Sequence, residues 1–487
     1  MSQAPHIRLS NITLLNFLSK IVFYLFVFTV GIISSRKLTS HVFGEVQFLS
    51  FLVGLSWMGL NFGLPGMLAK FWPSAILKHN GKLIHQLLKR ALLTACISII
   101  AHVIFIIIIY QIVIIHISFV HLMFWTFSNI SLAVTSVLMQ ATYRYKQSFY
   151  LNLFACLLGL VFLLLSFSQL QQLAYLYCFI FVNLFLSIGY CLLLSKYLFT
   201  LEETTESGHE EIPPANSWLR TSAYFAISAI LAGILWQRFE LSLLKHYYNF
   251  DQLAVYAIAF TLVSLFAEPL KLIPSGLLYY FSGIQHQQEK ASAKFSDFFI
   301  HFVWLVSFCG AFFYAHTDEM VVLFYTDKYA AAAEYARYLL LGFIPGICGY
   351  VFMNMHTGLG RARFLFIQDS LCALLFITGL GFAIPWFGLM GAALAKSAVM
   401  IISVISGAWY TQYHLRYDLP IVKPLLSFLI AFVLVYLSRG MFAENLILLS
   451  IKVVILFGLY LIISLSMGLI RRDLINETMG RIKNYVI

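Results

Sequence analysis

The chain has 487 residues, of which 61% are hydrophobic and only 10% charged, and its formal net charge is +11. Soluble domains contain roughly 45–50% apolar and about 25% charged residues, so this composition excludes a water-soluble globular protein. The seven cysteines lie singly in apolar stretches and form no CxxC pair, which argues against a disulfide framework or a zinc site. The chain must fold in lipid.

Long apolar segments recur along the whole chain. A membrane-spanning helix needs about 20 largely apolar residues. The first such segment is followed by Arg36 and Lys37 and has no small-residue cleavage site, so it predicts a helix and not a removed signal peptide. Fourteen spans are predicted, at residues 13–34, 43–66, 90–112, 118–140, 148–167, 173–195, 219–237, 253–273, 297–315, 335–356, 364–384, 389–410, 421–438 and 446–469.

One strongly polar, proline-containing stretch, LEETTESGHEEIPPANS, divides these spans into six and eight. We therefore predict an all-α integral membrane protein with two six-helix lobes and two accessory C-terminal helices. The predicted parts are an N-lobe with helices 1–6 (1–200), a cytoplasmic linker (201–217), a C-lobe with helices 7–12 (218–412), and helices 13–14 with a cytoplasmic tail (413–487).

The basic residues predict the orientation. With the N-terminus in the cytoplasm, 21 Lys and Arg residues fall on the cytoplasmic side and 8 on the other, so both termini are expected to be cytoplasmic. Residues 1–200 contain 12 Lys and Arg residues but a single acid, Glu45, and thus hold the whole net charge. Ordinary positive-inside bias explains much of this, but the scarcity of acids also favours a lobe that meets an anion.

Several segments carry a family resemblance, and together they cover nearly the whole chain. They are GIISSRKLTSHVFGEVQFLSFLVG, LWQRFELSLLKHYYNFDQLAVYAIAF, LFYTDKYAAAAEYARYLLLG, GLGRARFLFIQDS and IPWFGLMGAALAKS. In order and spacing they resemble the polysaccharide transporter family, the Wzx-type O-antigen flippases of the multidrug/oligosaccharidyl-lipid/polysaccharide (MOP) exporter superfamily. The chain departs from this pattern with Glu240 where Asp is usual and Ala254 where Gly is usual.

The resemblance implies a function as well as a fold. It implies a MATE-like bilobed bundle in the bacterial inner membrane that moves a polyprenyl-pyrophosphate-linked oligosaccharide to the outer leaflet by alternating access. The expected partners are this substrate, membrane lipids and other polysaccharide-assembly proteins, with no nucleic acid. No cofactor is expected, and transport would be coupled to an H⁺ or Na⁺ gradient or to the membrane potential.

Ionisable residues inside spans are functional candidates, because each costs about 2.5–3.5 kcal/mol near the bilayer centre. Lys20 and Lys271 resemble the cavity cations on the first and eighth helices of lipid II flippases, and we predict that they clamp the pyrophosphate. The alternatives are a snorkelling Lys20 and a structural pair of Lys271 with Glu268 at i,i+3 spacing. Three further basic candidates for the substrate cavity are Arg220, Arg238 and Lys396.

Neutral and acidic residues complete the candidate set. Asn61 and Gln140 are candidates for bonds to sugar hydroxyls, although such residues more often join helices. The coupling or gate candidates are Glu240, Glu268 and Asp369. Arg238 and Glu240 point to different faces, so that one of them could pair across the lobes at an outer gate; Asp369 has Arg361 and Arg363 as alternative partners.

No catalytic constellation or metal motif occurs in the sequence, and the longest polar loop is the 201–217 linker. A non-enzymatic transporter is therefore expected, with no catalytic residue and no metal ligand. Two alternatives stay open. A multidrug/cation antiporter of the same superfamily would need a buried acid, for which the C-lobe carboxylates are available. A membrane-bound glycan-assembly enzyme is disfavoured by the missing acid and base.

Overall fold

A computed structural model of the chain describes residues 9–64, 68, 81–112, 118–141, 145–202, 215–283, 288–439 and 445–470. These residues form helices and short connections, and no strand occurs among them. Within these ranges, nine helices are long and apolar enough to cross a membrane, or ten if two helices at Ala226–Trp236 and Glu240–Tyr247 form one span bent by 52°. The protein is an all-α integral membrane protein, as predicted.

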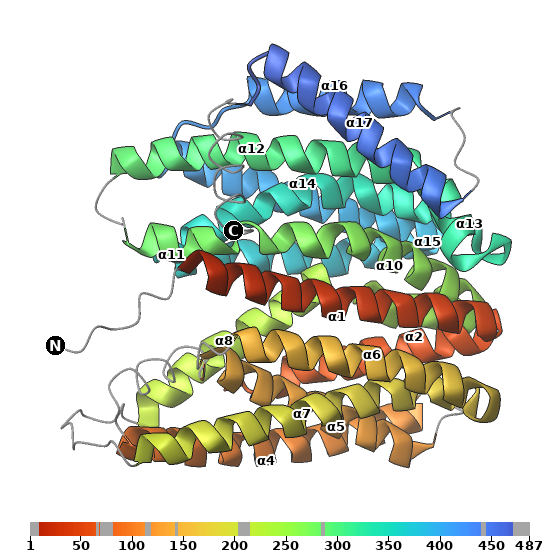
Figure 1. The fold of residues 1–487 in the computed structure, drawn as a ribbon, viewed down its shortest axis with the longest axis vertical. Helices are drawn as coiled ribbons and strands as arrows, with labels where there is room; N and C mark the ends of the chain where they lie inside the picture. Colours follow the sequence, from red (N-terminus) through yellow and green to blue (C-terminus); the bar gives the residue numbers. More distant parts are fainter. Residues whose placement is uncertain are drawn as a thin grey trace. The chain divides into compact units, whose positions relative to one another are not determined.

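Met1–Ala254 form the first compact unit, drawn from red to yellow-green in Figure 1. In it, α1 packs against α6, α7 packs against both α5 and α6, and α2 packs against α8. Small residues permit close approach: the Cys178 thiol of α7 donates to the Gly159 carbonyl of α6 at 3.2 Å. The helices are α1 (Leu9–Lys37), α2 (Ser40–Leu60), α4 (Gly81–Ile112), α5 (Phe119–Ala141), α6 (Tyr145–Leu170), α7 (Gln172–Glu202), α8 (Ala215–Trp236) and α9 (Glu240–Tyr247).

Val255–Ile487 form the second compact unit. Its α14 packs against α11, α12 and α15, and α12 packs against α16. The helices are α10 (Phe250–Leu272, which starts in the first unit), α11 (Ser275–Gly283), α12 (Gln288–Ala315), α13 (Thr317–Tyr325), α14 (Ala332–Gly358), α15 (Ala362–Tyr413), α16 (Val422–Leu437) and α17 (Leu446–Ser466).

Aromatic contacts attach the accessory helices α16 and α17, drawn in blue in Figure 1, to α12. The Trp304 ring of α12 stacks on Tyr460 of α17 at 5.2 Å between centroids, and its Nε1 donates to the Ser464 hydroxyl at 2.8 Å. The Tyr460 hydroxyl donates to the Ser427 carbonyl of α16 at 3.1 Å. The indole N–H of Trp304 and the hydroxyl of Tyr460 thereby have partners inside the protein, as lipid surroundings require.

Each of the fourteen predicted spans corresponds to a helix, with α15 supplying two of them. The backbone of α15 breaks at Gly388 (φ 62°, ψ −138°), between the predicted spans 364–384 and 389–410. The predicted end of the second span at residue 66 is wrong, because α2 ends at Leu60 in a turn with positive φ at Phe62 and Gly63. Helices α4 and α12 begin nine residues before the predicted spans, since their first turns are helical but polar.

The predicted lobe bounds stay a prediction. Most of the predicted linker, residues 203–214, lies outside the described residues, as does the predicted tail from residue 471 onward. The two compact units meet in sequence at Ala254, inside α10, and α8 belongs to the first of them.

Candidate functional site

A charged pair lies near the end of α10. Lys271 is only 7% exposed, and its Nζ lies 2.7 Å from Oε1 of Glu268. The spacing of three residues puts both side chains on one face of the helix, as the sequence predicted. The ammonium also faces two rings of α14, at 5.4 Å from the centroid of Tyr350 and 5.7 Å from that of Phe343. A buried ammonium of this kind attracts anions strongly, because water screens it little.

A second buried ammonium belongs to Lys396 of α15, which is 1% exposed. Its Nζ lies 4.6 Å from the ring centroid of Phe376 and 5.7 Å from that of Phe260. Phe260 in turn meets Phe343 edge to face, at 5.6 Å between centroids. One aromatic cluster, formed by α10, α14 and α15, therefore holds both Lys271 and Lys396 through cation–π contacts.

Two carboxylates belong to the same region of the second unit. Glu268 of α10 and the half-buried Asp369 of α15 both act electrostatically on Tyr350 of α14. Within the described ranges, Asp369 forms no ion pair with Arg361 or Arg363, the partners considered from the sequence. The structure thus brings together two predicted candidates, Lys271 and Glu268, and places Lys271 over Tyr350, a residue that the sequence did not single out.

In the first unit, Lys20 lies on α1 and is half-buried, without an ion pair or hydrogen bond to any described residue. The neighbouring Ser19 takes part in a neutral polar network between α1, α6 and α7. The Asn152 amide donates to the Ser19 hydroxyl at 2.7 Å and to the Tyr190 hydroxyl at 2.9 Å, and Ser148 lies 3.0 Å from Tyr190. An amide inside the predicted span 148–167 was the available signal for this network.

Arg238 lies between α8 and α9 and reaches α2. Its Nη1 donates to Oε1 of Gln47 at 2.6 Å, and the Gln47 amide donates to the Tyr175 hydroxyl of α7 at 3.4 Å. Glu240, the first residue of α9, is fully buried. Arg238 therefore links α2 to the α8–α9 connection inside the first unit.

The remaining candidates are neutral or only partly described. Asn61 is 4% exposed, and its Oδ1 accepts a bond from the Gly63 N–H at 2.8 Å, so it stabilises the turn after α2. Arg220 lies on α8, but its side chain is outside the described part, as is that of Gln140 at the end of α5. Among the described residues, no group of three or more His, Cys, Asp and Glu side chains could hold a metal ion.

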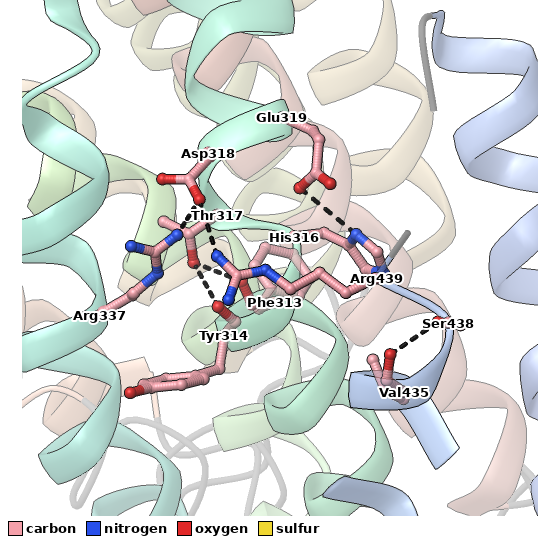
Figure 2. Close-up of polar contacts among 10 residues, drawn as sticks. All are labelled: Phe313, Tyr314, His316, Thr317, Asp318, Glu319, Arg337, Val435, Ser438 and Arg439. Carbon is pink, nitrogen blue, oxygen red and sulfur yellow. Dashed lines mark hydrogen bonds and ion pairs between the residues drawn. The ribbon is translucent and has the colours of Figure 1, made fainter. Parts of the chain in front are cut away.

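Figure 2 shows a second charged cluster, on α13. Asp318 pairs with Arg337 of α14, and it also accepts a bond from Nη2 of Arg439, beyond the end of α16, at 3.1 Å. Glu319 lies 3.3 Å from Nδ1 of the fully buried His316. Burial by itself raises the pKa of the Glu319 carboxyl, but the contacts with His316 and the Lys452 charge lower it, and the net shift is downward. This cluster attaches α13 to its neighbours.

Comparison with solved structures identifies the fold. An inward-facing multidrug resistance MATE family transporter of the MOP superfamily matches with a TM-score of 0.64 at 12% identity, over 82% of this chain and 94% of that one. A Vibrio cholerae MATE transporter, VcmN in mutant form, matches with a TM-score of 0.61 at 12% identity, over 84% and 96%. The chain has the fold of the MOP superfamily.

A third solved structure matches this chain over nearly the full length of both proteins. The lipid II flippase MurJ, in an inward closed conformation, matches with a TM-score of 0.50 at 15% identity, over 96% of this chain and 98% of that one. No protein-family profile and no curated protein matches the sequence. At these identities the likeness concerns the fold alone, and the similar proteins are transporters and a flippase, not enzymes.

Proposed function

We propose that this protein is a flippase that moves a polyprenyl-pyrophosphate-linked oligosaccharide from the inner to the outer leaflet for surface polysaccharide synthesis. The observation that carries the proposal is the buried, ring-lined Lys271 ammonium in a protein with the MOP fold. A flippase breaks no bond, so it needs cations for the diphosphate and polar groups for the sugars rather than a catalytic acid and base.

Two further features support this substrate class. Lys396 places another buried ammonium on the same aromatic cluster, beside the rings of Phe376 and Phe260. The match to the lipid II flippase MurJ covers nearly the whole of both chains. We propose that an H⁺ or Na⁺ gradient or the membrane potential drives the cycle.

A strain without the gene tests the function. We expect loss of surface glycan and accumulation of the lipid-linked unit at the inner leaflet, measured by lipid extraction and glycan staining. Lys271→Ala and Lys20→Ala should fail to restore the glycan at normal membrane abundance, whereas Lys→Arg at either position should retain much of it because the charge stays. If the lipid-linked unit is never made, the protein acts in assembly and the proposal fails.

The second candidate is a multidrug/cation antiporter. The partly buried carboxylates of Glu268 and Asp369 in the second unit favour it, because an exchanged proton or sodium ion needs an interior acid. The MATE transporters among the similar structures have this fold. A deletion strain with normal surface glycan and increased sensitivity to cationic drugs would support the antiporter over the flippase.

We also propose that both termini lie in the cytoplasm, because most of the basic residues fall on that side. Single cysteines placed in a cysteine-free background test this orientation with a membrane-impermeant reagent. Probes at Ser168 and Asn445 should react in intact cells, and probes at His79 and Gly208 only after permeabilisation. Reaction of the His79 probe in intact cells would overturn the orientation.

A further inference from the structure

We propose that Glu268 is a displaceable counter-ion, which occupies the anion site of Lys271 until a diphosphate group replaces it. This inference rests on the proposed function and names a residue that sets the affinity for the substrate head group. It begins from the cost of leaving a buried ammonium without a compensating anion. In the structure described here that anion is the Glu268 carboxylate, at 2.7 Å.

The two partners are not equally held. The Lys271 side chain is 6% exposed, and its ammonium faces the rings of Tyr350 and Phe343, both on α14. The Glu268 side chain is 26% exposed and shares its helix with the lysine. Rotation about its side-chain bonds therefore moves the carboxylate away without any movement of helices, whereas the ammonium stays between its rings. The member of the pair that an incoming anion displaces is the carboxylate.

A diphosphate suits this exchange. It offers several oxygens and more than one negative charge, while the carboxylate reaches the ammonium through a single oxygen, Oε1. After displacement, Glu268 stays near the site as a negative charge, because it lies on the same helix three residues before Lys271. Like charges in an interior repel, so the freed carboxylate weakens the diphosphate complex and takes its place again when the substrate leaves. The Lys271–Glu268 pair therefore keeps the affinity for the diphosphate low enough for the substrate to be released.

Glu268 competes with the diphosphate for Lys271, so removing its charge should tighten diphosphate binding. Binding of inorganic diphosphate and of farnesyl diphosphate to the purified full-length protein in nanodiscs is measured by calorimetry. We expect Glu268→Gln to lower both dissociation constants about tenfold, the size of one hydrogen bond to a charged group. Glu268→Asp, which keeps the charge but shortens the side chain, should lower them less. Lys271→Gln should weaken binding, and in the double variant the gain from Glu268→Gln should vanish.

Glu334→Gln is the matched control, because it removes the same charge from an exposed part of α14, where Oε1 of Glu334 accepts a bond from the Tyr338 hydroxyl at 3.2 Å. It should leave both dissociation constants unchanged. Equal or weaker diphosphate binding by well-folded Glu268→Gln and Glu268→Asp would overturn the inference, and so would an absence of diphosphate binding in every form.

The two proposals fail in different ways. Tighter binding by Glu268→Gln, in a protein whose deletion leaves surface glycan intact, would uphold the anion exchange and refute the flippase. Loss of glycan on deletion, with no effect of Glu268 on diphosphate binding, would uphold the flippase and refute the exchange.

Discussion

Gly342 offers a sharp test of the packing between α14 and α15. A methyl group added there would collide with Cα of Ser397 and lie 2.7 Å from its Cβ and 2.8 Å from its carbonyl oxygen. The Ser397 hydroxyl donates to the Tyr338 carbonyl at 2.5 Å, so the same crossing is also fixed by a hydrogen bond between the helices. The obstacle is backbone, which cannot turn aside as the end of a flexible side chain can.

The expected effect of Gly342→Ala follows from this geometry. Forcing an extra carbon into a packed interior costs about 1–3 kcal/mol, which lowers the ratio of folded to unfolded protein roughly 5- to 150-fold. Alanine is the better helix former by roughly 1 kcal/mol, so the same change at an open position should be neutral or stabilising. A lower stability of Gly342→Ala would therefore report the close helix crossing, because helix propensity alone would raise the stability.

Gly381→Ala is the control, because a methyl group at Gly381 of α15 would have no atom within 4 Å. Both variants are purified in detergent, and their unfolding is followed by intrinsic fluorescence during heating. Gly342→Ala should melt below the wild type and be less abundant in membranes, and Gly381→Ala should do neither. Equal melting temperatures for the two variants would refute the contact between Gly342 and Ser397.

Two smaller effects are expected at α13. Asp318→Asn should lower the melting temperature slightly, by the equivalent of about 1 kcal/mol, since the Asp318 side chain is 50% exposed and solvent weakens its pairs with Arg337 and Arg439. The lowered pKa of Glu319 means that its contribution to stability is complete above the usual carboxyl pKa of about 4.3 and is lost as the pH falls through the folded-state value. Glu319→Gln should therefore flatten the acid side of a plot of melting temperature against pH, and an unchanged slope would contradict the shift.

Local features of the sequence were sufficient for the spans, because each helix carries its own apolar run. Spans 364–384 and 389–410 were predicted as two separate runs, and the structure breaks α15 between them at Gly388, three residues after Pro385. The Glu268–Lys271 pair followed from i,i+3 spacing on one helix. These predictions needed no knowledge of which helices are neighbours.

Contacts between helices could not be predicted in this way. Tyr350 belongs to the candidate site because α14 packs near α10, which brings its ring under the Lys271 ammonium. The sequence around Tyr350 is like that of any other apolar helix and gives no sign of this contact. Gln47 was overlooked for the same reason, since its bond to Arg238 joins residues 191 positions apart. The turn after α2 was missed because Asn61 lies in a continuous apolar run, although an Asn followed by Phe-Gly is compatible with positive φ.

The distribution of buried lysines bears on where the anion site lies. By sequence, the entire net charge belongs to residues 1–200, which pointed to the first lobe. Yet the lysines that are buried among the described residues, Lys271, Lys396 and Lys452, all belong to the second unit. In the first unit, the network between α1, α6 and α7 is built from neutral groups such as Asn152 and Tyr190. Burying a charge costs more than burying an amide or a hydroxyl, so a buried lysine indicates a specific role more strongly than many basic residues near span ends. The second unit is therefore the place to look first for the diphosphate.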